Sequence, residues 1–446
     1  MTSDAARAIV VGGGLAGCEA AWQLAERGRQ VTLIEMRPVR ATPAHRSEHL
    51  AELVCTNSFK SEEPSNAHGM LKREMRALGS VVLDVAQRTR VPAGVALAVD
   101  RDRFARGVTQ AIQTHPGITI ERNEITALPD GPAVIATGPL TSDALSLSIA
   151  GLLGDDGLAF YDAIAPVVLA ESIDEAKVFR ASRWGRGEGD DYLNCPMTRD
   201  EYQSFVRALR AAESYPGHDW ENVPYFEGCL PIEVMAERGE DTLRFGPMKP
   251  IGLTDPRTGR RPWAVVQLRR EDTAGQMWNL VGFQTRLRTG EQRRVFRMIP
   301  GLEGAEFLRM GSIHRNTYLN FPARLLPHGA PHARPDLIIA GQLTGVEGYT
   351  ESAASGILAG INLDRFLSGR PAAVPPATTM LGALYRYLRT AKPDAFQPMN
   401  SNFGLLDPLV DAPRDKARRR EMLVARAAAD FNAWLETEAV APEAVA

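Results

Sequence analysis

The chain begins with a short apolar segment that runs directly into a glycine-rich turn. The apolar segment covers residues 8–11, and a helical pattern covers residues 18–27. Between them, three glycines have G-x-G-x-x-G spacing, at Gly12, Gly14 and Gly17. A second apolar segment over residues 30–34 ends in Glu35. Strand, glycine turn, helix and second strand are the parts of a dinucleotide-binding βαβ unit, so we predict an α/β fold of the Rossmann type.

Each part of this unit has a physical task. The glycines permit a tight turn, let the backbone approach a pyrophosphate, and let the helix pack closely on the strand. The helix N-terminus offers free N–H groups to the phosphates, and an acidic residue about 20 residues later accepts hydrogen bonds from a ribose. The residues that we predict to bind the cofactor are Gly12, Gly13, Gly14, Leu15, Ala16, Gly17 and Glu35. The alternative is a glycine-rich turn without a ligand.

The kind of dinucleotide follows from what the rest of the sequence lacks. No second G-x-G-x-x-G follows a predicted strand, and the glycines of residues 185–189 have a different spacing. A nicotinamide reductant would then have no Rossmann domain of its own and would reach the bound cofactor through an open cavity. We therefore predict FAD, retained between turnovers, in a Rossmann-like domain of the glutathione-reductase type.

Segments far downstream return to the same predicted sheet. Residues 132–138 and 335–342 are short apolar strand patterns that end in small residues, and a helical pattern covers residues 351–366. A strand, a glycine-rich loop and a helix suit a close approach to the cofactor, so we extend the predicted cofactor site. Its further members are Gly341, Gln342, Gly348 and Tyr349.

The chain of 446 residues is too long for one hydrophobic core. Between the two groups of strands, predicted strands at residues 264–268 and 279–283 alternate with a helix at residues 199–213. We interpret this stretch as a smaller inserted α+β domain. The predicted segments are residues 1–165, the first part of the FAD-binding domain; residues 166–309, the inserted domain; and residues 310–446, the second part of the FAD-binding domain with C-terminal helices.

Composition excludes several classes of protein. With 44% hydrophobic and 24% charged residues, the chain is typical of a globular protein. No apolar run approaches the ~20 residues that cross a bilayer, and the N-terminus has no signal peptide, so we expect a cytoplasmic protein without membrane contact. The four cysteines form no C-x-x-C pair, so we expect neither a metal site nor a disulfide framework.

Positive charge is concentrated in one stretch of the chain. Residues 257–324 contain 13 arginines and 5 acidic residues, although the whole chain has a net charge of −3. Such a stretch either meets phosphates or forms an ordinary ion-paired surface, and charge alone leaves both interpretations open.

Two cysteines stand in polar surroundings. Cys55 is followed by Thr-Asn-Ser, and Cys229 lies on a turn flanked by Glu227 and Glu233. A thiol reacts when it is exposed and electrostatically assisted, so both are candidate reactive thiols. We interpret the other two cysteines as packing or structural residues, namely Cys18 and Cys195.

Several longer motifs are similar to those of a known family. They are Val11-Gly-Gly-Gly-Leu-Ala-Gly17, Leu53-Val-Cys-Thr-Asn-Ser58, Asn66-Ala-His-Gly-Met-Leu-Lys72, Tyr192-Leu-Asn-Cys-Pro-Met197, Phe226-Glu-Gly-Cys229, Arg244-Phe-Gly-Pro-Met-Lys-Pro250, His314-Arg-Asn-Thr-Tyr318 and Gly341-Gln-Leu-Thr-Gly-Val-Glu-Gly-Tyr349. With them the chain resembles, nearly end to end, the short branch of the glucose-inhibited-division-A family, the folate- and FAD-dependent tRNA (uracil-5-)-methyltransferases. The longer branch, which modifies the tRNA wobble uridine, has a large C-terminal helical domain that we do not expect here.

The resemblance implies transfer of a one-carbon unit from methylenetetrahydrofolate to C5 of uridine 54 in the tRNA T-loop. It implies bound FAD, NAD(P)H as reductant, tRNA as partner, and no stable protein partner. Uracil C5 is a poor nucleophile until a thiolate adds to C6. Our hypothesis is that Cys229 attacks C6, while Cys55 lies near the flavin as a base or as a reversible trap of the transferred carbon. The two roles are interchangeable at this point.

Other residues of the motifs are candidates for binding. Tyr349, Tyr318 and His314 are candidates for stacking on the folate pterin or the flipped uracil, with core packing as the alternative for Tyr318. Candidates for contact with tRNA phosphates or the folate tail are Arg270, Arg286, Arg288 and Lys249, with ordinary ion pairs as the alternative. Two other functions stay open: an FAD oxidoreductase of a small substrate, and an FAD-containing partner in tRNA wobble-uridine modification.

Overall fold

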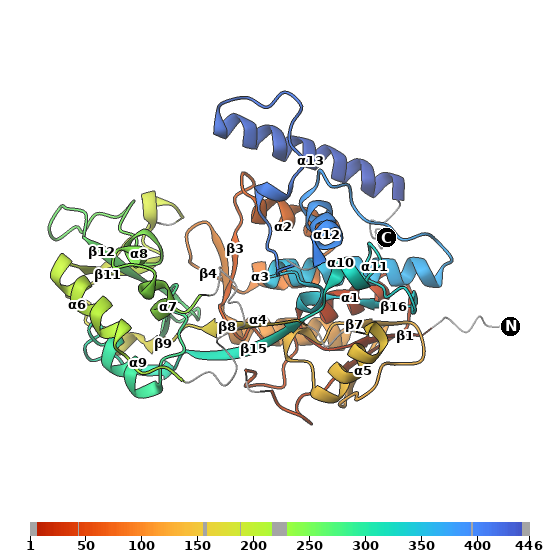
Figure 1. Ribbon diagram of the computed structural model, residues 1–446, viewed down its shortest axis with the longest axis horizontal. Helices are drawn as coiled ribbons and strands as arrows, with labels where there is room; N and C mark the ends of the chain where they lie inside the picture. The colour runs from red at the N-terminus through yellow and green to blue at the C-terminus, as the bar shows by residue number, and fades with distance from the viewer. Residues whose placement is uncertain are drawn as a thin grey trace.

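The computed structural model describes residues 7–42, 44–154, 158–187, 189–215, 230–393 and 396–438, with side chains except at residues 158–164, 312–317 and 416. Figure 1 shows two parts: a larger one built from the beginning and the end of the chain, and a smaller one built from its middle. The strands β8 and β15 run from one part to the other.

The larger part contains a five-stranded parallel sheet with the strand order β16-β7-β1-β2-β6. Its strands are β1 (Ala8–Val11), β2 (Val31–Glu35), β6 (Ile118–Arg122), β7 (Ala133–Ile135) and β16 (Leu337–Ile339). The central strands are buried almost throughout, as parallel strands covered on both faces are, whereas the edge strand β6 alternates between buried and exposed residues. The apolar segments predicted at residues 8–11, 30–34, 132–138 and 335–342 all contribute strands to this sheet, which confirms the Rossmann-like fold.

Helices α1 (Leu15–Ala25) and α11 (Tyr349–Leu367) cross in direct backbone contact. A Cβ atom added at Gly356 would lie 2.1 Å from the carbonyl oxygen of Ala16, and one added at Gly360 would lie 2.7 Å from that of Ala20. Glycine and alanine at the crossing therefore permit an approach that larger side chains would prevent. Since α1 and α11 lie more than 300 residues apart in the chain, their contact joins the two segments of the larger part.

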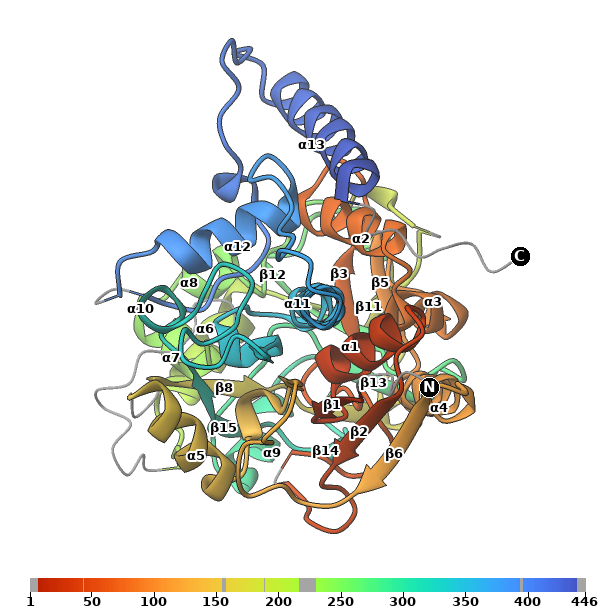
Figure 2. The ribbon, with the colours of Figure 1, turned by 90° about the vertical axis from the view of Figure 1, so that its right-hand side faces the viewer.

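Other helices and a small sheet complete the larger part. The helices are α2 (Ala67–Ala77), α3 (Val81–Arg88), α4 (Arg101–Thr114), α5 (Asp143–Leu153), α10 (Phe321–Arg324), α12 (Met380–Thr390) and α13 (Lys416–Glu438). The small sheet has the strand order β3-β5-β4 and consists of β3 (Ser58–Ser61), β4 (Arg90–Val91) and β5 (Ala96–Val99). Figure 2 shows α13 at the top of the molecule, where it packs on α2.

The smaller part is built on a six-stranded antiparallel sheet with the strand order β10-β11-β12-β13-β9-β14. Its strands are β9 (Val167–Leu169), β10 (Phe179–Arg180), β11 (Tyr192–Met197), β12 (Ala264–Arg270), β13 (Met277–Leu280) and β14 (Phe307–Arg309). Its helices are α6 (Arg199–Arg210), α7 (Ile232–Glu237), α8 (Thr242–Phe245) and α9 (Thr289–Phe296). This is the α+β arrangement predicted for the inserted stretch.

The two parts have separate hydrophobic cores. One cluster of buried residues draws on residues 8–153 and 318–434, and the other draws on residues 168–305. Between them, β8 (Leu158–Ile164) pairs with β15 (Ser312–Tyr318) in antiparallel register along the whole of both strands. The predicted boundaries at 165/166 and 309/310 fall beside this ladder, and we keep the three-segment division as a proposal.

Several helix ends differ from the sequence patterns by one to three residues. α1 starts at Leu15 rather than Cys18 because the carbonyl oxygen of Gly14 already accepts a hydrogen bond from the N–H of Cys18 at 2.9 Å. α6 ends at Arg210 because the chain then turns away to form a β-bridge between Ser214 and Leu287. Within the described ranges, no helix combines the length and the apolarity needed to cross a bilayer.

Candidate active site

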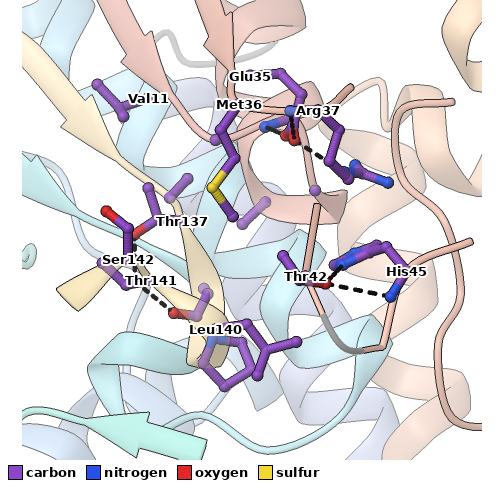
Figure 3. Close-up of a pocket in the computed structure, with 18 of the residues that line it drawn as sticks. Val11, Glu35, Met36, Arg37, Thr42, His45, Thr137, Leu140, Thr141 and Ser142 are labelled. Carbon is purple, nitrogen blue, oxygen red and sulfur yellow. Dashed lines mark hydrogen bonds and ion pairs between the residues drawn. The ribbon is translucent and has the colours of Figure 1, made fainter. Parts of the chain in front are cut away.

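The glycine-rich turn forms one wall of a cavity at the carboxyl ends of β1 and β2. This first cavity is lined by residues 11–16, 34–37, 136–142 and 341–342, among others (Figure 3). It occupies about 1050 Å³ with its open mouth included. Open α/β sheets bind ligands at the carboxyl ends of their strands, so the position of this cavity suits a dinucleotide.

The glycines of the turn have distinct positions. Gly12 has φ +102°, and a Cβ atom there would lie 2.6 Å from the carbonyl oxygen of Ala136. A Cβ atom at Gly17 would lie 1.7 Å from the carbonyl oxygen of Gly12, whereas one at Gly14 would meet no protein atom within 4 Å. Gly12 and Gly17 therefore allow the turn to close. Gly14 leaves open the space in front of the α1 N-terminus, where a pyrophosphate fits.

Glu35 ends β2 beside the turn, and both of its carboxylate oxygens are engaged (Figure 3). Oε2 accepts a hydrogen bond from the N–H of Gly13 at 2.7 Å, and Oε1 accepts from the backbone N–H and the Nε of Arg37 at 3.0 and 2.8 Å. Burial opposes ionisation, but the Arg37 guanidinium and these hydrogen bonds outweigh it and lower the pKa of Glu35. The charged carboxylate keeps further lone pairs for ribose hydroxyls, so this wall fits FAD.

A second cavity of about 1580 Å³, open mouth included, adjoins the first. It lies between the two parts of the molecule, because Arg269 and Asn279 line it from the inserted domain and Cys55 and His68 line it from the larger part. Five residues line both cavities, namely Val54, Pro139, Leu140, Gln342 and Tyr349. A ligand in the first cavity therefore faces the second along this shared wall.

The predicted downstream residues border these two cavities. Gly341 and Gln342 line the first cavity, Gly348 lines the second, and Tyr349 lines both. Gly341 has φ +75°, and its N–H donates to Oγ of Ser355 at 2.7 Å. The strand β16 and the N-terminus of α11 thus bring these residues to the site across the sheet from the glycine turn.

Cys55 lies in the wall of the second cavity on a loop that is fixed from two sides. The hydroxyl oxygen of Tyr349 accepts hydrogen bonds from the N–H groups of Cys55 and Thr56 at 2.7 and 3.2 Å. From the inserted domain, Arg269 donates through Nη2 to Oγ1 of Thr56 at 2.5 Å and through Nε to Oδ1 of Asn57 at 3.0 Å. The half-buried thiol is thereby held close to the wall that the two cavities share.

Two arginines approach Cys55 from outside the second cavity. Arg101 donates to the carbonyl oxygen of Cys55 at 3.3 Å and pairs with Glu271 at 2.7 Å. Arg309 donates to the same carbonyl oxygen at 3.5 Å. Burial and the neighbouring Arg101 lower the pKa of Arg309 to about 10, against the opposite effects of Glu271 and Cys55. Both guanidinium groups thus contact the backbone of Cys55.

A buried carboxylate organises another wall of the second cavity. Glu351, in the first turn of α11, is fully buried, accepts the N–H of Ser401 at 3.0 Å, and lies 3.4 Å from Nδ1 of His68. Burial favours the neutral acid, yet Lys60, His68 and the Ser401 N–H together lower the pKa of Glu351 to about 2. Lys60 and His68 both line the second cavity, so the buried Glu351 places a negative charge beside this part of its wall.

The remaining predicted residues lie elsewhere. Cys18 and Cys195 are fully buried, and burial raises the pKa of both thiols, in agreement with packing roles. Tyr318 is only 3% exposed and its hydroxyl donates to the carbonyl oxygen of Phe396, so its position favours core packing over stacking. Cys229 lies outside the described residues, as does the side chain of His314.

The four candidate cations for tRNA or folate lie outside the walls of both cavities, so their role stays a prediction. They are Arg270, Arg286, Arg288 and Lys249. Arg288 pairs with Glu213 at 3.1 Å, and the guanidinium of Arg270 lies 5.6 Å from the centre of the Trp278 ring.

Sequence reasoning missed several charged residues of this site, namely Arg37, Arg101, Arg269 and Glu351. A signal existed for Arg37, which follows Glu35 by two residues. Arg269 belongs to the arginine-rich stretch, next to the candidate Arg270. Arg101 and Glu351 carry no local signal, because tertiary pairing alone brings them to the site.

Comparison with known proteins identifies relatives along nearly the whole chain. The family model for glucose inhibited division protein A matches residues 7–371. The methylenetetrahydrofolate–tRNA-(uracil-5-)-methyltransferase TrmFO of Geobacter sulfurreducens is 58% identical over 96% of this chain and 98% of its own. The protein of the same name from Moorella thermoacetica is 55% identical over 96% of this chain and 98% of its own.

Solved structures agree on the fold. GidA of Aquifex aeolicus superimposes with a TM-score of 0.69 over 99% of this chain and 78% of its own, at 18% sequence identity. That likeness confirms the predicted Rossmann-like fold class, and the family model and the relatives cover most of the same residues. The chain therefore belongs to the glucose inhibited division protein A family.

Proposed function

We propose that this protein transfers a one-carbon unit from methylenetetrahydrofolate to C5 of a uracil in tRNA, the reaction after which its relatives are named. The observation that carries the proposal is the position of Cys55. Its thiol lies on a fixed loop of the second cavity, next to the wall shared with the first. We place the folate and the uracil in this second cavity, which adjoins the first along that wall.

The first cavity supports FAD as the resident cofactor. Gly14 leaves the space that a pyrophosphate needs, and the α1 N-terminus and Glu35 offer the groups that bind phosphate and ribose. FAD, when bound, supplies the electrons that reduce the transferred carbon. Gln342 and Tyr349 line both cavities, so their side chains lie between the proposed flavin site and the proposed substrate site.

The balance of the reaction requires a reductant. The methylene carbon of the folate is one two-electron step more oxidised than a methyl group, so exchange of the uracil C5 hydrogen for a methyl group consumes a hydride and, in net terms, one proton. We propose NAD(P)H as the hydride source. The folate then leaves as tetrahydrofolate, with protons on the two nitrogens that the methylene had bridged.

We assign different steps of the reaction on uracil to the two candidate thiols. Uracil C5 becomes nucleophilic when a thiolate adds to C6, and we assign this addition to Cys229 on the basis of its family motif alone. We assign to Cys55 the removal of the C5 proton or the reversible capture of the transferred carbon. Arg101 and Arg309, beside the Cys55 backbone, support an anionic Cys55 in either task.

Within tRNA we propose uridine 54 of the T-loop as the target, and the cytoplasm as the place of reaction. A stacked base has to be extruded before a thiol reaches C6, at a cost of a few kcal/mol. The second cavity offers space for the extruded base, and contacts between protein and RNA offset the cost.

The test of the function uses the purified protein with its flavin, unmodified tRNA, methylenetetrahydrofolate and NAD(P)H. We expect 5-methyluridine at position 54, detected by nuclease digestion and mass spectrometry, and none when the folate is omitted. A flavin-loaded protein that forms no 5-methyluridine would overturn the proposal.

A second experiment assigns the thiols. tRNA that contains 5-fluorouracil cannot lose a C5 proton and therefore traps the covalent adduct. We expect Cys229→Ala to abolish the adduct and Cys55→Ala to retain it. The reverse pattern would move the nucleophile to Cys55.

A further inference from the structure

A third cavity lies behind the loop that carries Cys55. It occupies about 1020 Å³ with its mouth included, between residues 44–54, the beginning of α4 and the end of β14. Basic side chains from all three segments line it, namely Arg46, His49, Arg101, Arg106 and Arg309. Its acidic lining residues are Glu52 and Asp102.

The two carboxylates do not balance this positive charge. Glu52 is already engaged, since it accepts hydrogen bonds from the N–H groups of Arg46 and Ser47 at 2.9 and 3.0 Å and pairs with Arg37 at 3.3 Å. Asp102 is exposed and lies 3.9 Å from Arg106, a distance at which an exposed pair contributes little. Arg101 is paired with Glu271 at 2.7 Å, so the excess of positive charge in the cavity comes from Arg46, Arg106 and Arg309.

Arg309 shows the imbalance most directly. Among the described residues, its buried Nε has no hydrogen-bond partner, and its guanidinium donates only to the carbonyl oxygen of Cys55, at 3.5 Å. No carboxylate of the described residues lies within 4 Å of it, and burial together with the neighbouring cation Arg101 lowers its pKa to about 10. An anion in the cavity would give this guanidinium the charged partner that it lacks.

The third cavity also adjoins the second. Ala44 lines both of them, and Val54 lines all three cavities. The loop of residues 53–55 therefore separates the proposed base-binding space from a basic space directly behind it. A nucleotide carries its base and its phosphate on different sides of its sugar, so an extruded nucleotide matches two adjoining spaces of this kind.

We propose that the third cavity binds a backbone phosphate of the RNA next to the target uridine. This inference rests on the proposed function, which makes RNA the substrate. Arg101 and Arg309 form the partly buried base of the site, whereas Arg46 and Arg106 are exposed and border its mouth. A phosphate that enters between them contacts both pairs, and its RNA strand continues over the exposed arginines.

The test compares exposed arginines at the mouth with an exposed arginine away from it. The variants are Arg46→Gln, Arg106→Gln and the double substitution. Arg103→Gln is the matched control, because Arg103 is exposed on α4 and does not line the cavity. We measure tRNA binding by the flavin-loaded protein as a function of salt concentration.

For the double variant we expect tRNA binding to weaken about tenfold at low salt, and the slope of log K against log[salt] to fall by about 1 to 2. For Arg103→Gln we expect less than a twofold change. Double-variant binding that matches the Arg103→Gln control would overturn the proposal.

NAD(P)H also carries phosphates, so a second arm measures flavin reduction by NAD(P)H without RNA. We expect the double variant to reduce its flavin at the wild-type rate and the wild-type KM for NAD(P)H. An increased KM together with unchanged tRNA binding would assign the cavity to the reductant and overturn the proposal. Both arms are independent of methyl transfer, so they are read separately from the formation of 5-methyluridine that tests the proposed function.

Discussion

The hydroxyl oxygen of Tyr349 accepts a hydrogen bond from the N–H of Cys55, across a separation of 294 residues in the chain. Tyr349 is the first residue of α11 and lines both the first and the second cavity. One side chain thus fixes the position of the thiol relative to the cofactor site.

Replacement of this tyrosine by phenylalanine should reduce the rate of methyl transfer. Tyr349→Phe keeps the ring, whose centroid lies 5.9 Å from that of Phe59, but removes the hydroxyl oxygen that accepts from two N–H groups. Since a displacement of about 1 Å at a reacting group costs up to about 100-fold, we expect kcat to fall about 10- to 100-fold with normal flavin content. Tyr387→Phe is the control, because Tyr387 donates to the carbonyl oxygen of Gln397 and lines neither cavity. An unchanged kcat would contradict the role of the contact.

Two substitutions in the glycine turn should affect different properties, one the stability of the apoprotein and the other flavin binding. Gly17→Ala places a Cβ atom 1.7 Å from a carbonyl oxygen, so we expect the apoprotein to lose about 3 kcal/mol or more of stability. Gly14 has φ −76° and open space for a Cβ atom, so Gly14→Ala should leave the apoprotein as stable as the wild type and yet impair flavin binding. Thermal unfolding of the apoproteins and flavin absorbance after reconstitution measure the two effects. Full flavin binding by Gly14→Ala would argue against a pyrophosphate at this position.

Loss of the Arg37 side chain should destabilise the protein. Arg37→Met leaves the buried Glu35 carboxylate without its ion-pair partner, for which we expect a loss of about 3–5 kcal/mol in the free energy of unfolding. The double variant Glu35→Gln/Arg37→Met removes both charges and should recover part of that loss. Urea unfolding of the apoproteins provides the values. Equal losses in the single and double variants would show that the ion pair is not the cause.

Stability should also depend on pH through a buried carboxyl group. Glu74 accepts the N–H groups of Met380 and Leu381 at the start of α12, both at 2.8 Å, and burial raises its pKa to about 8 from an ordinary 4.5. The folded chain therefore keeps a proton that the unfolded chain releases between these values. The contribution to stability is complete below pH 4.5 and is lost as the pH rises to about 8.

We expect this group to lower the free energy of unfolding by up to about 1.4 kcal/mol per pH unit in that window. Glu74→Gln, which cannot ionise, should show a smaller slope between pH 5 and 8 in urea unfolding. Glu19 has its pKa raised to about 8 by burial as well, so part of the slope should persist in the variant. Identical slopes in wild type and variant would contradict the assignment to Glu74.

The sequence was sufficient to predict the parts of the site that local patterns encode. The glycine turn and Glu35 belong to one continuous βαβ unit, so spacing and periodicity determine their geometry. Contacts between distant segments follow no such pattern. Arg269 reaches Asn57 across 212 residues, and the pairing of Arg101 with Glu271 spans 170. Only the docking of the inserted domain creates these contacts, and their residues look like ordinary surface charges in the sequence.

The arginine-rich stretch shows the limit of counting charge along a chain. Several of its arginines pair with nearby carboxylates, among them Arg257 with Asp255 and Arg294 with Glu291. Of the basic residues in the third cavity, only Arg309 comes from that stretch. The basic residues of the third cavity therefore come mostly from outside the arginine-rich stretch, and the sequence alone does not show that they lie together.

The contact between Gly356 and Ala16 also sets an order of events during translation. A ribosome makes β1 and α1 first, and more than 300 further residues before α11 emerges to cover α1. The inserted domain, whose core is complete by residue 305, folds in the meantime. The face of α1 that α11 covers thus stays uncovered until synthesis reaches the last quarter of the chain.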